Sequence, residues 1–298
     1  MVTPAPRNAN EFIEQALDER ATALSQVFKA DILGFAGPLI LNVDDIIRNA
    51  VERICQGKQR RNKLVVVLTT SGGYINVVQR VVETFRHHYD TVEFVVPNYA
   101  YSAGTVLAMS GNAIHMNYYS RLGPIDPQVN TIKGMQVPAL GYLVQWERLV
   151  KKAKRGKLTT AEMQLMIDGF DQAQLYQFEQ AKELSIALLK EWLATYKFKD
   201  WLVTKTRKLP VDDKMRKKRA EEIARELSNP NRWHSHGYGI SMEVLRRDLN
   251  VRIDDFDAKP KIGAKVKDYH GLLDDYMARR GNEGVVHTIN QYFPFGSG

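Results

Sequence analysis

Hydrophobic and polar positions follow two different periods in the first half of the chain. Residues 64–68 and 92–96 are short, continuous runs of apolar and β-branched residues, typical of strands covered on both faces. Residues 74–89 between them carry apolar side chains at helical spacing. The same patterns predict helices at 10–30, 42–55 and 102–111, a strand and turn at 31–41 and a strand at 113–116. Strands that alternate with helices predict an α/β fold with a parallel sheet and right-handed crossovers.

The pattern changes after Pro138, where strand-like runs give way to long helical segments. Residues 140–153 and 160–196 keep helical periodicity with few helix-breaking residues. The elements predicted after them are a basic connection at 203–220, a helix at 219–228, a loop at 233–240 and helices at 241–249 and 270–280. Residues 284–298 are expected to be loosely ordered.

These changes divide the chain into four predicted parts. They are an N-terminal helix at 1–30, an α/β core at 31–138, a helical region at 139–230 and a C-terminal segment at 231–298 that returns to the core. The helical region carries more apolar positions than one lone helix buries. We therefore expect it to serve as a lid or to pack against a neighbouring subunit, which predicts a homo-oligomer.

The composition favours a soluble protein of a reducing compartment. Apolar residues make up 44% of the 298 residues, enough for a sizeable core. Cys55 is the single cysteine, which excludes an internal disulfide framework. The chain begins with a polar stretch, and no apolar run approaches the roughly 18 residues of a membrane span. We expect a cytoplasmic protein without a membrane span.

The net charge of +8 raises the possibility of a nucleic-acid partner. The excess cations lie mainly in two clusters, at 151–157 and 205–219, and acidic residues follow the second cluster closely. Such runs are typical of solvated helix faces or oligomer contacts. The chain has neither zinc-finger spacing nor a ribonucleoprotein aromatic motif, so a nucleic-acid partner is not expected.

Two glycine-containing turns follow the predicted strands. The first is Thr70-Ser71-Gly72-Gly73, which can offer bare backbone N–H groups. The second, at 101–104, presents Ser102 beside small residues at the start of a helix. An exposed serine beside free amides provides what acyl transfer needs, a nucleophile and donors for the oxyanion. Each turn also has a simpler interpretation, because serine often caps helices and glycine often forms tight turns.

The order and spacing of three motifs carry a resemblance to a known family. They are TSGG at 70–73, YSAGT at 101–105 and LGPIDPQ at 122–128, each at the end of a strand or in the loop after one. The chain resembles the Clp protease/crotonase superfamily. Within it, the chain is similar to the serine dehydrogenase proteinase family, relatives of signal peptide peptidase A. The similarity covers residues 60–130, extends to 30–60 and returns at 233–255.

The resemblance implies a spiral of ββα units with a helical outer layer that mediates oligomerisation, and peptidase activity with a serine nucleophile. By motif, the nucleophile falls on Ser102. The oxyanion donors would be the backbone N–H groups of Ala103 and of Gly73, with Gly72 as the alternative. No cofactor is implied. His234 and His236 lack further ligands at matching spacing, so no metal site is expected either.

The general base does not follow from the motifs. Where the Clp proteolytic subunit has a histidine, this chain has Asp126, whose carboxylate, with an ordinary pKa of about 4, is a poor base for serine. Relatives of signal peptide peptidase A use a lysine instead, which requires burial to lower its pKa. The nearest candidate is Lys133, and the others are the lysines Lys151, Lys152, Lys154 and Lys157 and the histidines His234 and His236. The remaining alternative is that the chain has no base.

Three functions remain open on the sequence alone. The favoured one is an ATP-independent serine endopeptidase acting on a peptide or protein that pairs with an exposed strand edge. The second is a catalytically inactive oligomeric scaffold or regulatory protein, which suits the missing histidine. The third is a crotonase-type acyl-coenzyme A enzyme, which would share the oxyanion hole but needs an acidic residue over the acyl group and a coenzyme A site.

Overall fold

The computed structural model describes residues 6–57, 60–125, 128–130, 136–204, 206–235 and 237–296. Within this part of the chain, the centre is a seven-stranded sheet in the order β10-β5-β3-β2-β1-β11-β12. Its strands are β1 (Asp31–Ala36), β2 (Lys63–Thr69), β3 (Thr91–Val95), β5 (Ala113–Met116), β10 (Asp254–Asp255), β11 (Gly284–Thr288) and β12 (Gln291–Phe295). The strands from β10 to β1 run parallel, which confirms the predicted α/β sheet, and β11 and β12 are antiparallel.

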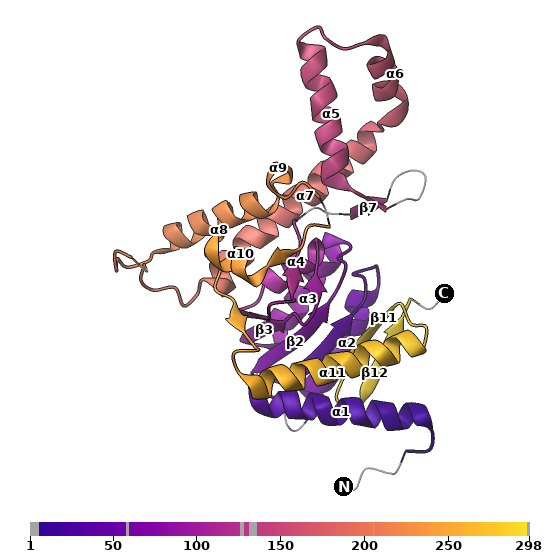
Figure 1. Cartoon of the computed structure of the whole chain (residues 1–298), viewed down its shortest axis with the longest axis vertical. Helices are drawn as coiled ribbons and strands as arrows, with labels where there is room; N and C mark the ends of the chain where they lie inside the picture. The colour runs from indigo at the N-terminus through magenta and orange to yellow at the C-terminus, as the bar shows by residue number, and fades with distance from the viewer. Residues whose placement is uncertain are drawn as a thin grey trace.

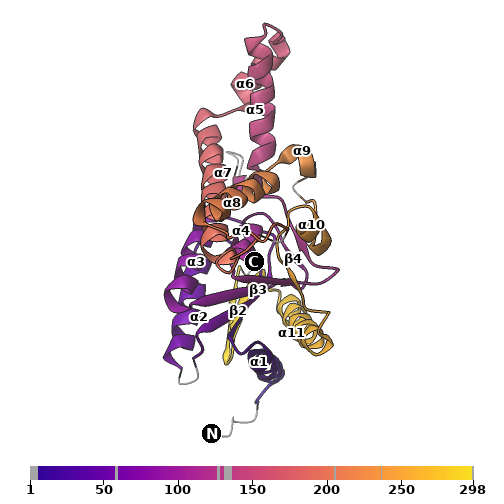
Figure 2. The same ribbon diagram turned by 90° about the vertical axis from the view of Figure 1, so that its left-hand side faces the viewer.

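Helices cover both faces of the sheet (Figure 2). On one face lie α2 (Val43–Gln56), α3 (Ile75–His88) and α4 (Ala103–Met109), and on the other α1 (Ala9–Phe28) and α11 (Pro260–Arg279). Successive residues of a strand point to opposite faces, so Val66 and Leu68 of β2 enter one core while Val65 and Val67 enter the other. This two-sided burial explains why β2 reads as a continuous apolar run.

An arm projects from the body of the protein (Figure 1). It consists of α5 (Ala139–Lys154), α6 (Thr160–Gly169) and the first part of α7 (Gln172–Trp192), with the ribbon β7 (Gln128–Asn130) and β8 (Gln136–Pro138) near its base. Its own small core contains Leu143, Leu175 and Phe178. The rest of α7, the π-helical turn η1 (Leu193–Lys197) and α8 (Asp213–Leu227) pack together beside α4.

A small three-stranded sheet joins distant parts of the sequence. Its order is β4 (Tyr99–Ala100), β6 (Arg121–Leu122) and β9 (Ile240–Ser241), and the short helices α9 (Pro230–Trp233) and α10 (Met242–Arg247) flank β9 in the sequence. β4 pairs parallel with β6, and β6 pairs antiparallel with β9. The segment around residue 240 thus returns to the body of the protein close to the strand that leads into Ser102.

Three predicted elements need correction. The single segment at 160–196 is two helices, because Asp171 caps a new helix by accepting a hydrogen bond from the Gln174 amide at 2.8 Å. The last helix begins at Pro260 rather than at residue 270, since proline is well tolerated in a first helical turn. Residues 284–295 are not loose, because β11 pairs with β1 and with β12. Among the described residues, no helix has the length and apolar character required to cross a membrane.

Candidate active site

The TSGG turn is fastened to β4. The Thr70 amide donates to the Tyr99 carbonyl at 3.1 Å, and the Tyr101 amide donates to the Thr70 carbonyl at 3.0 Å. The turn then needs two glycines, because Gly72 has φ +102° and Gly73 has φ +148°, values that other residues rarely adopt. The two strand-to-helix connections are therefore hydrogen-bonded side by side.

Leu39, which the sequence did not single out, holds the same turn from the other side. Its amide donates to the Gly72 carbonyl at 2.8 Å, and its carbonyl accepts from the Tyr74 amide at 2.9 Å. A Cβ atom on Gly73 would overlap the Leu39 carbonyl. The chain after β1 thus clamps the turn in its glycine-only conformation.

Ser102 has an unusual backbone conformation, with φ +52° and ψ −119°. It stands at the N-cap position of α4, but its side chain makes no capping hydrogen bond, so the helix-cap interpretation does not account for it. Ser102 is also only 1% exposed, which corrects the expectation of an exposed serine. The backbones of two neighbouring glycines pack against this buried residue.

Gly72 and Gly123 lie so close to Tyr101 and Ser102 that a side chain at either position would clash. A Cβ atom on Gly72 would lie 2.9 Å from the Ser102 Cβ and 2.7 Å from the Tyr101 carbonyl. A Cβ atom on Gly123 would lie 3.2 Å from the Ser102 amide. The three motifs of the sequence therefore converge on one serine.

Thr105 explains why the second and third motifs belong together. Its hydroxyl accepts from the Gly123 amide at 2.9 Å and lies 2.8 Å from the Ala100 carbonyl, to which it can donate. This buried side chain therefore ties the YSAGT segment to the loop that begins with Gly123. Loss of this hydroxyl would leave the Gly123 amide with only its longer hydrogen bond to the Ala100 carbonyl, at 3.3 Å, and would weaken the tie.

Two backbone amides beside Ser102 are available as donors. In the part of the chain that the structure describes, neither the Gly73 amide nor the Ala103 amide donates a hydrogen bond. The Gly72 amide is engaged, since it donates to the Thr70 hydroxyl at 3.1 Å. Of the two glycines that the sequence left open, Gly73 therefore has the free N–H group.

The candidate bases are not brought to Ser102 by any described contact. Asp126, Lys133 and His236 lie outside the described residues. His234 is exposed, and its left-handed backbone, φ +58°, ends α9. The lysines of the first basic cluster lie on α5 and the turn after it, within the arm of Figure 1.

Two of those arm lysines contact carboxylates on the arm itself. Lys152 forms an ion pair with Glu162, and Lys151 Nζ lies 4.0 Å from Glu147. Lys151, Lys154 and Lys157 are exposed. Exposed lysines lack the burial that a lysine requires to act as the base for serine. The candidacy of this cluster as the base is therefore not supported.

Lys197 has a lowered pKa but stands at the other end of α4 from Ser102. Burial lowers its pKa to about 8, against the opposing effect of the Asp254 carboxylate. The adjacent Tyr196 ring lies under the Arg86 guanidinium at 3.7 Å, and Arg86 hydrogen-bonds Ser110, which follows α4. Ser102 precedes α4, so Lys197 does not reach it.

His270 is the histidine that the structure places against the TSGG turn. Its Nε2 lies 3.0 Å from the hydroxyl of Thr69, the last residue of β2. Burial lowers the pKa of His270, while Asp274 one helical turn later raises it. The two hydrogen-bonded residues are 201 positions apart, so no local pattern in the sequence signals this contact.

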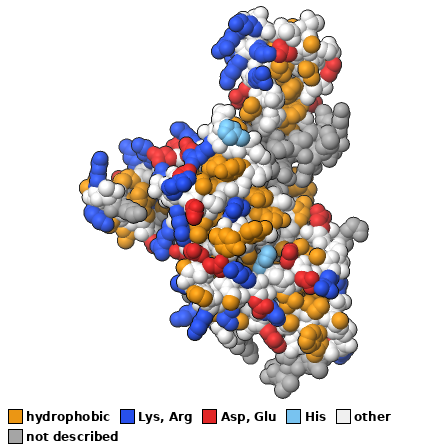
Figure 3. All heavy atoms as spheres, viewed as in Figure 1, with side chains coloured by type: hydrophobic (Ala, Val, Ile, Leu, Met, Phe, Trp, Pro, Cys, Tyr) orange, Lys and Arg blue, Asp and Glu red, His pale blue; other side chains and the backbone are white. Residues whose placement is uncertain are grey.

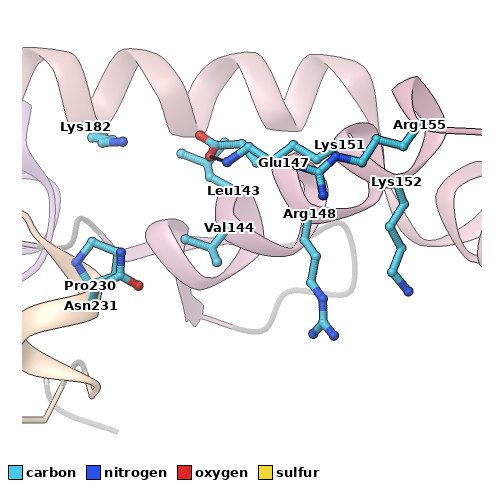
Figure 4. A pocket seen from close by; sticks show the side chains of 10 residues that line it. All are labelled: Leu143, Val144, Glu147, Arg148, Lys151, Lys152, Arg155, Lys182, Pro230 and Asn231. Atoms are coloured by element: carbon cyan, nitrogen blue, oxygen red, sulfur yellow. Dashed lines mark ion pairs between the residues drawn. The ribbon is translucent and has the colours of Figure 1, made fainter. Parts of the chain in front are cut away.

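A cavity of about 530 Å³ lies on the arm, away from these motifs. Leu143, Val144, Pro230 and Asn231 form its apolar and neutral part, and the remaining side chains are charged: Glu147, Arg148, Lys151, Lys152, Arg155 and Lys182 (Figure 4). None of the residues around Ser102 lines it. Among the described side chains, no three acidic, cysteine or histidine groups gather as a metal site would require.

The model of a known protein family matches residues 16–208, and the match includes all three motifs. The family is described as ClpP-like SDH-type serine proteinases. This chain belongs to that family. Among curated proteins, the uncharacterized protein MJ1495 of Methanocaldococcus jannaschii is 23% identical over 63% of this chain and 51% of its own length. A second one, MJ0137, is 22% identical over 37% of this chain and 38% of its own length. The chain thus spans about half, or less, of these relatives.

Solved structures of proteases match this chain with low sequence identity and low TM-scores. The 1510-N membrane-bound stomatin-specific protease is 13% identical, with a TM-score of 0.44 over 89% of this chain and 86% of that one. ClpP1 from Listeria monocytogenes is 10% identical, with a TM-score of 0.41 over 82% and 95%. The ClpP catalytic domain from Plasmodium falciparum is 10% identical, with a TM-score of 0.45 over 85% and 94%. Membership of the SDH-type family rests on the match over residues 16–208.

Proposed function

We propose that this SDH-type chain is an ATP-independent serine endopeptidase with Ser102 as nucleophile. The observation that carries the proposal is the geometry of Ser102, held at positive φ directly against Gly72 and next to two unengaged amides. Such strained conformations cost about 1–3 kcal/mol, persist only where the surroundings enforce them and cluster at active sites. The simpler role of a helix cap does not require this strain.

The proposed reaction is acyl transfer to Ser102. Its hydroxyl oxygen attacks the peptide carbonyl carbon, and the amides of Gly73 and Ala103 receive the negative charge that develops on the carbonyl oxygen. A base takes the hydroxyl proton and returns it to the leaving amine, and water then hydrolyses the acyl-enzyme. Lys133 remains our candidate for the base, with His236 as the alternative. Because Ser102 is buried, local opening must precede substrate binding.

Labelling by a fluorophosphonate probe tests this proposal. We expect the wild-type protein to be labelled near pH 8 and Ser102→Ala to lose the label, because the probe reacts only with an activated serine. Ser71→Ala is the matched control, since Ser71 is an exposed serine in the adjacent turn and its loss should leave labelling in place. Mass spectrometry of the labelled peptide locates the modified residue.

Absence of labelling in a folded wild-type protein would contradict the peptidase proposal. The burial of Ser102 would then favour the inactive scaffold. Coenzyme A binding, measured by calorimetry on the same sample, would instead support the crotonase-type alternative. Labelling that persists in Ser102→Ala would overturn the assignment of Ser102 as the nucleophile.

We further propose a homo-oligomer that works in the cytoplasm on peptide or protein substrates, with no cofactor and no nucleic-acid partner. The arm supports self-association, because α6 has no buried residue although it carries Met163, Leu165 and Ile167. Lysine and arginine side chains gather on the upper part of the arm (Figure 3), where a neighbouring subunit could cover them. The single cysteine supports a reducing compartment.

A further inference from the structure

The small sheet beside Ser102 has one buried and one half-buried face. Ala100, Leu122 and Ile240 are fully buried and face the core. Tyr99 and Ser241 are the register partners of Arg121 and alternate with those core residues, so all three lie on the opposite, half-buried face. Arg121 is thus the central charged group of a face that borders the nucleophile.

Two opposed glycines let side chains lie flat on this face. A Cβ atom on Gly239 would stand 2.9 Å from Arg121 Cδ, and one on Gly123 would stand 2.8 Å from Tyr101 Cδ1. The aliphatic part of Arg121 therefore lies on the backbone of one glycine, and the Tyr101 ring lies on the other. Tyr101 directly precedes Ser102, so this ring adjoins the reacting group.

The guanidinium of Arg121 is anchored but has no acidic partner. Its Nη1 donates to the carbonyls of Tyr118 and Ser120, at 2.8 and 2.9 Å. Among the described residues, no carboxylate lies within ion-pair distance, and Nε and Nη2 donate to no acceptor. Arg232, in contrast, is paired with both Glu226 and Asp248. A partly desolvated guanidinium held in place on one edge gains most from an anion at its remaining donors.

Two tyrosines lie on and just after β4, the strand that pairs with Arg121. The rings of Tyr99 and Tyr101 are stacked, 5.1 Å apart and inclined by 15°. Tyr99 is the register partner of Arg121, so the stacked pair of rings lies on the strand next to this arginine. Burial raises the pKa of Tyr101, and the positive charge of Arg121 opposes that rise. A guanidinium edge with adjacent phenol donors matches the planar, acceptor-only carboxylate group.

We propose that Arg121 binds a carboxylate of the peptide substrate, next to the bond that Ser102 cleaves. The ligand chemistry is a side-chain carboxylate of aspartate or glutamate, or the free carboxyl terminus of the peptide. Tyr99 and Tyr101 add hydroxyl donors and one wall of this carboxylate subsite. The inference rests on the proposed function, since it assigns the substrate class of the same site.

Equilibrium binding tests the subsite without requiring catalysis. The probe is a panel of fluorescein-labelled hexapeptides that scan aspartate and glutamate through every position, each matched by its asparagine or glutamine isostere and each with a free or an amidated carboxyl terminus. Anisotropy is measured on Ser102→Ala. We expect at least one carboxylate peptide to bind ten times more tightly than its neutral isostere, and Arg121→Gln in that background to abolish the difference. Comparison of the peptides with a free and with an amidated carboxyl terminus identifies which carboxylate is bound.

Two further variants separate charge and geometry from general damage. Arg121→Lys keeps the positive charge but loses the planar guanidinium, which can bind a carboxylate through two donors. It should therefore retain only part of the preference for carboxylate peptides. Arg279→Gln, an exposed arginine paired with Asp275, should leave the preference unchanged. Equal affinity for acidic and neutral peptides, or a preference that survives Arg121→Gln, would overturn the inference.

Labelling distinguishes this failure from failure of the proposed function. Arg121→Gln with Ser102 intact should still react with the fluorophosphonate probe, because the subsite does not activate the serine. Labelling without any carboxylate preference would overturn the subsite and leave the peptidase proposal in place. A wild-type protein that is neither labelled nor able to bind any peptide of the panel would overturn both.

Discussion

His270 is a single residue whose protonation state should affect the free energy of unfolding. It hydrogen-bonds Thr69, directly before the TSGG turn, and burial lowers its pKa below the ordinary value of about 6.5. Below about pH 6.5 the unfolded chain therefore binds a proton at this residue more readily than the folded chain. We expect the free energy of unfolding to decrease as the pH falls below about 6.5, until the folded-state pKa is passed.

Urea denaturation at pH 7.5, 6.5 and 5.5 measures this dependence. His270→Gln removes the titrating group while its amide can still hydrogen-bond Thr69, so this part of the pH dependence should disappear. His234→Gln is the control, because His234 is exposed and no comparable change is expected. An equal pH dependence in wild type and His270→Gln would show that His270 is not the responsible group.

At the scale of elements, β12 closes one edge of the central sheet. Phe295 is 9% exposed, belongs to the larger core and stacks on Phe35 with a centroid distance of 5.9 Å. Because its ring is buried, Phe295→Ala should lower the free energy of unfolding by about 3 kcal/mol. Urea denaturation at neutral pH measures the change.

Gln291→Ala in the same strand is the matched control, since Gln291 is only half-buried. Its effect should stay near about 1 kcal/mol, because the side chain loses one hydrogen bond, accepted from the Thr288 hydroxyl at 3.2 Å, and no core packing. If Phe295→Ala had an equally small effect, residues 284–295 would be loosely ordered in solution, as the sequence pattern suggested, and the hairpin would contribute little.

The whole molecule exposes an apolar helix at the end of its arm. Leu165 and Ile167 of α6 are 61% and 69% exposed, a cost that a neighbouring subunit would remove. We expect light scattering after size-exclusion chromatography to give a mass well above the 34.0 kDa of one chain. The double variant Leu165→Lys, Ile167→Lys should shift this mass toward the monomer.

Leu202→Lys controls for the added charge, because Leu202 is 64% exposed but lies outside the arm helices. It should leave the mass unchanged. A wild-type mass of one chain at micromolar concentration would contradict the oligomer. An oligomer that survives the double variant would instead assign the contact to another surface.

The sequence by itself determined the order of the main strands and helices in residues 31–116, the two glycine turns and the family. These features are local, since burial of β2 on both faces produces its apolar run and the motifs are contiguous residues with fixed backbone needs. The resemblance implied that Ser102 is the nucleophile. In the structure, Ser102 has a strained backbone and lies close to Gly72.

Only the tertiary structure decided the surroundings of that serine. It buried Ser102, left the Gly73 amide rather than the Gly72 amide free, placed His270 on Thr69 and paired Arg121 with Tyr99. It also ordered β12, which carries little strand signal of its own, by pairing it with β11. The physical reason is that these contacts depend on which strands pair, and the His270–Thr69 contact joins residues 201 positions apart. Local periodicity encodes how each segment folds but not which distant segment it meets.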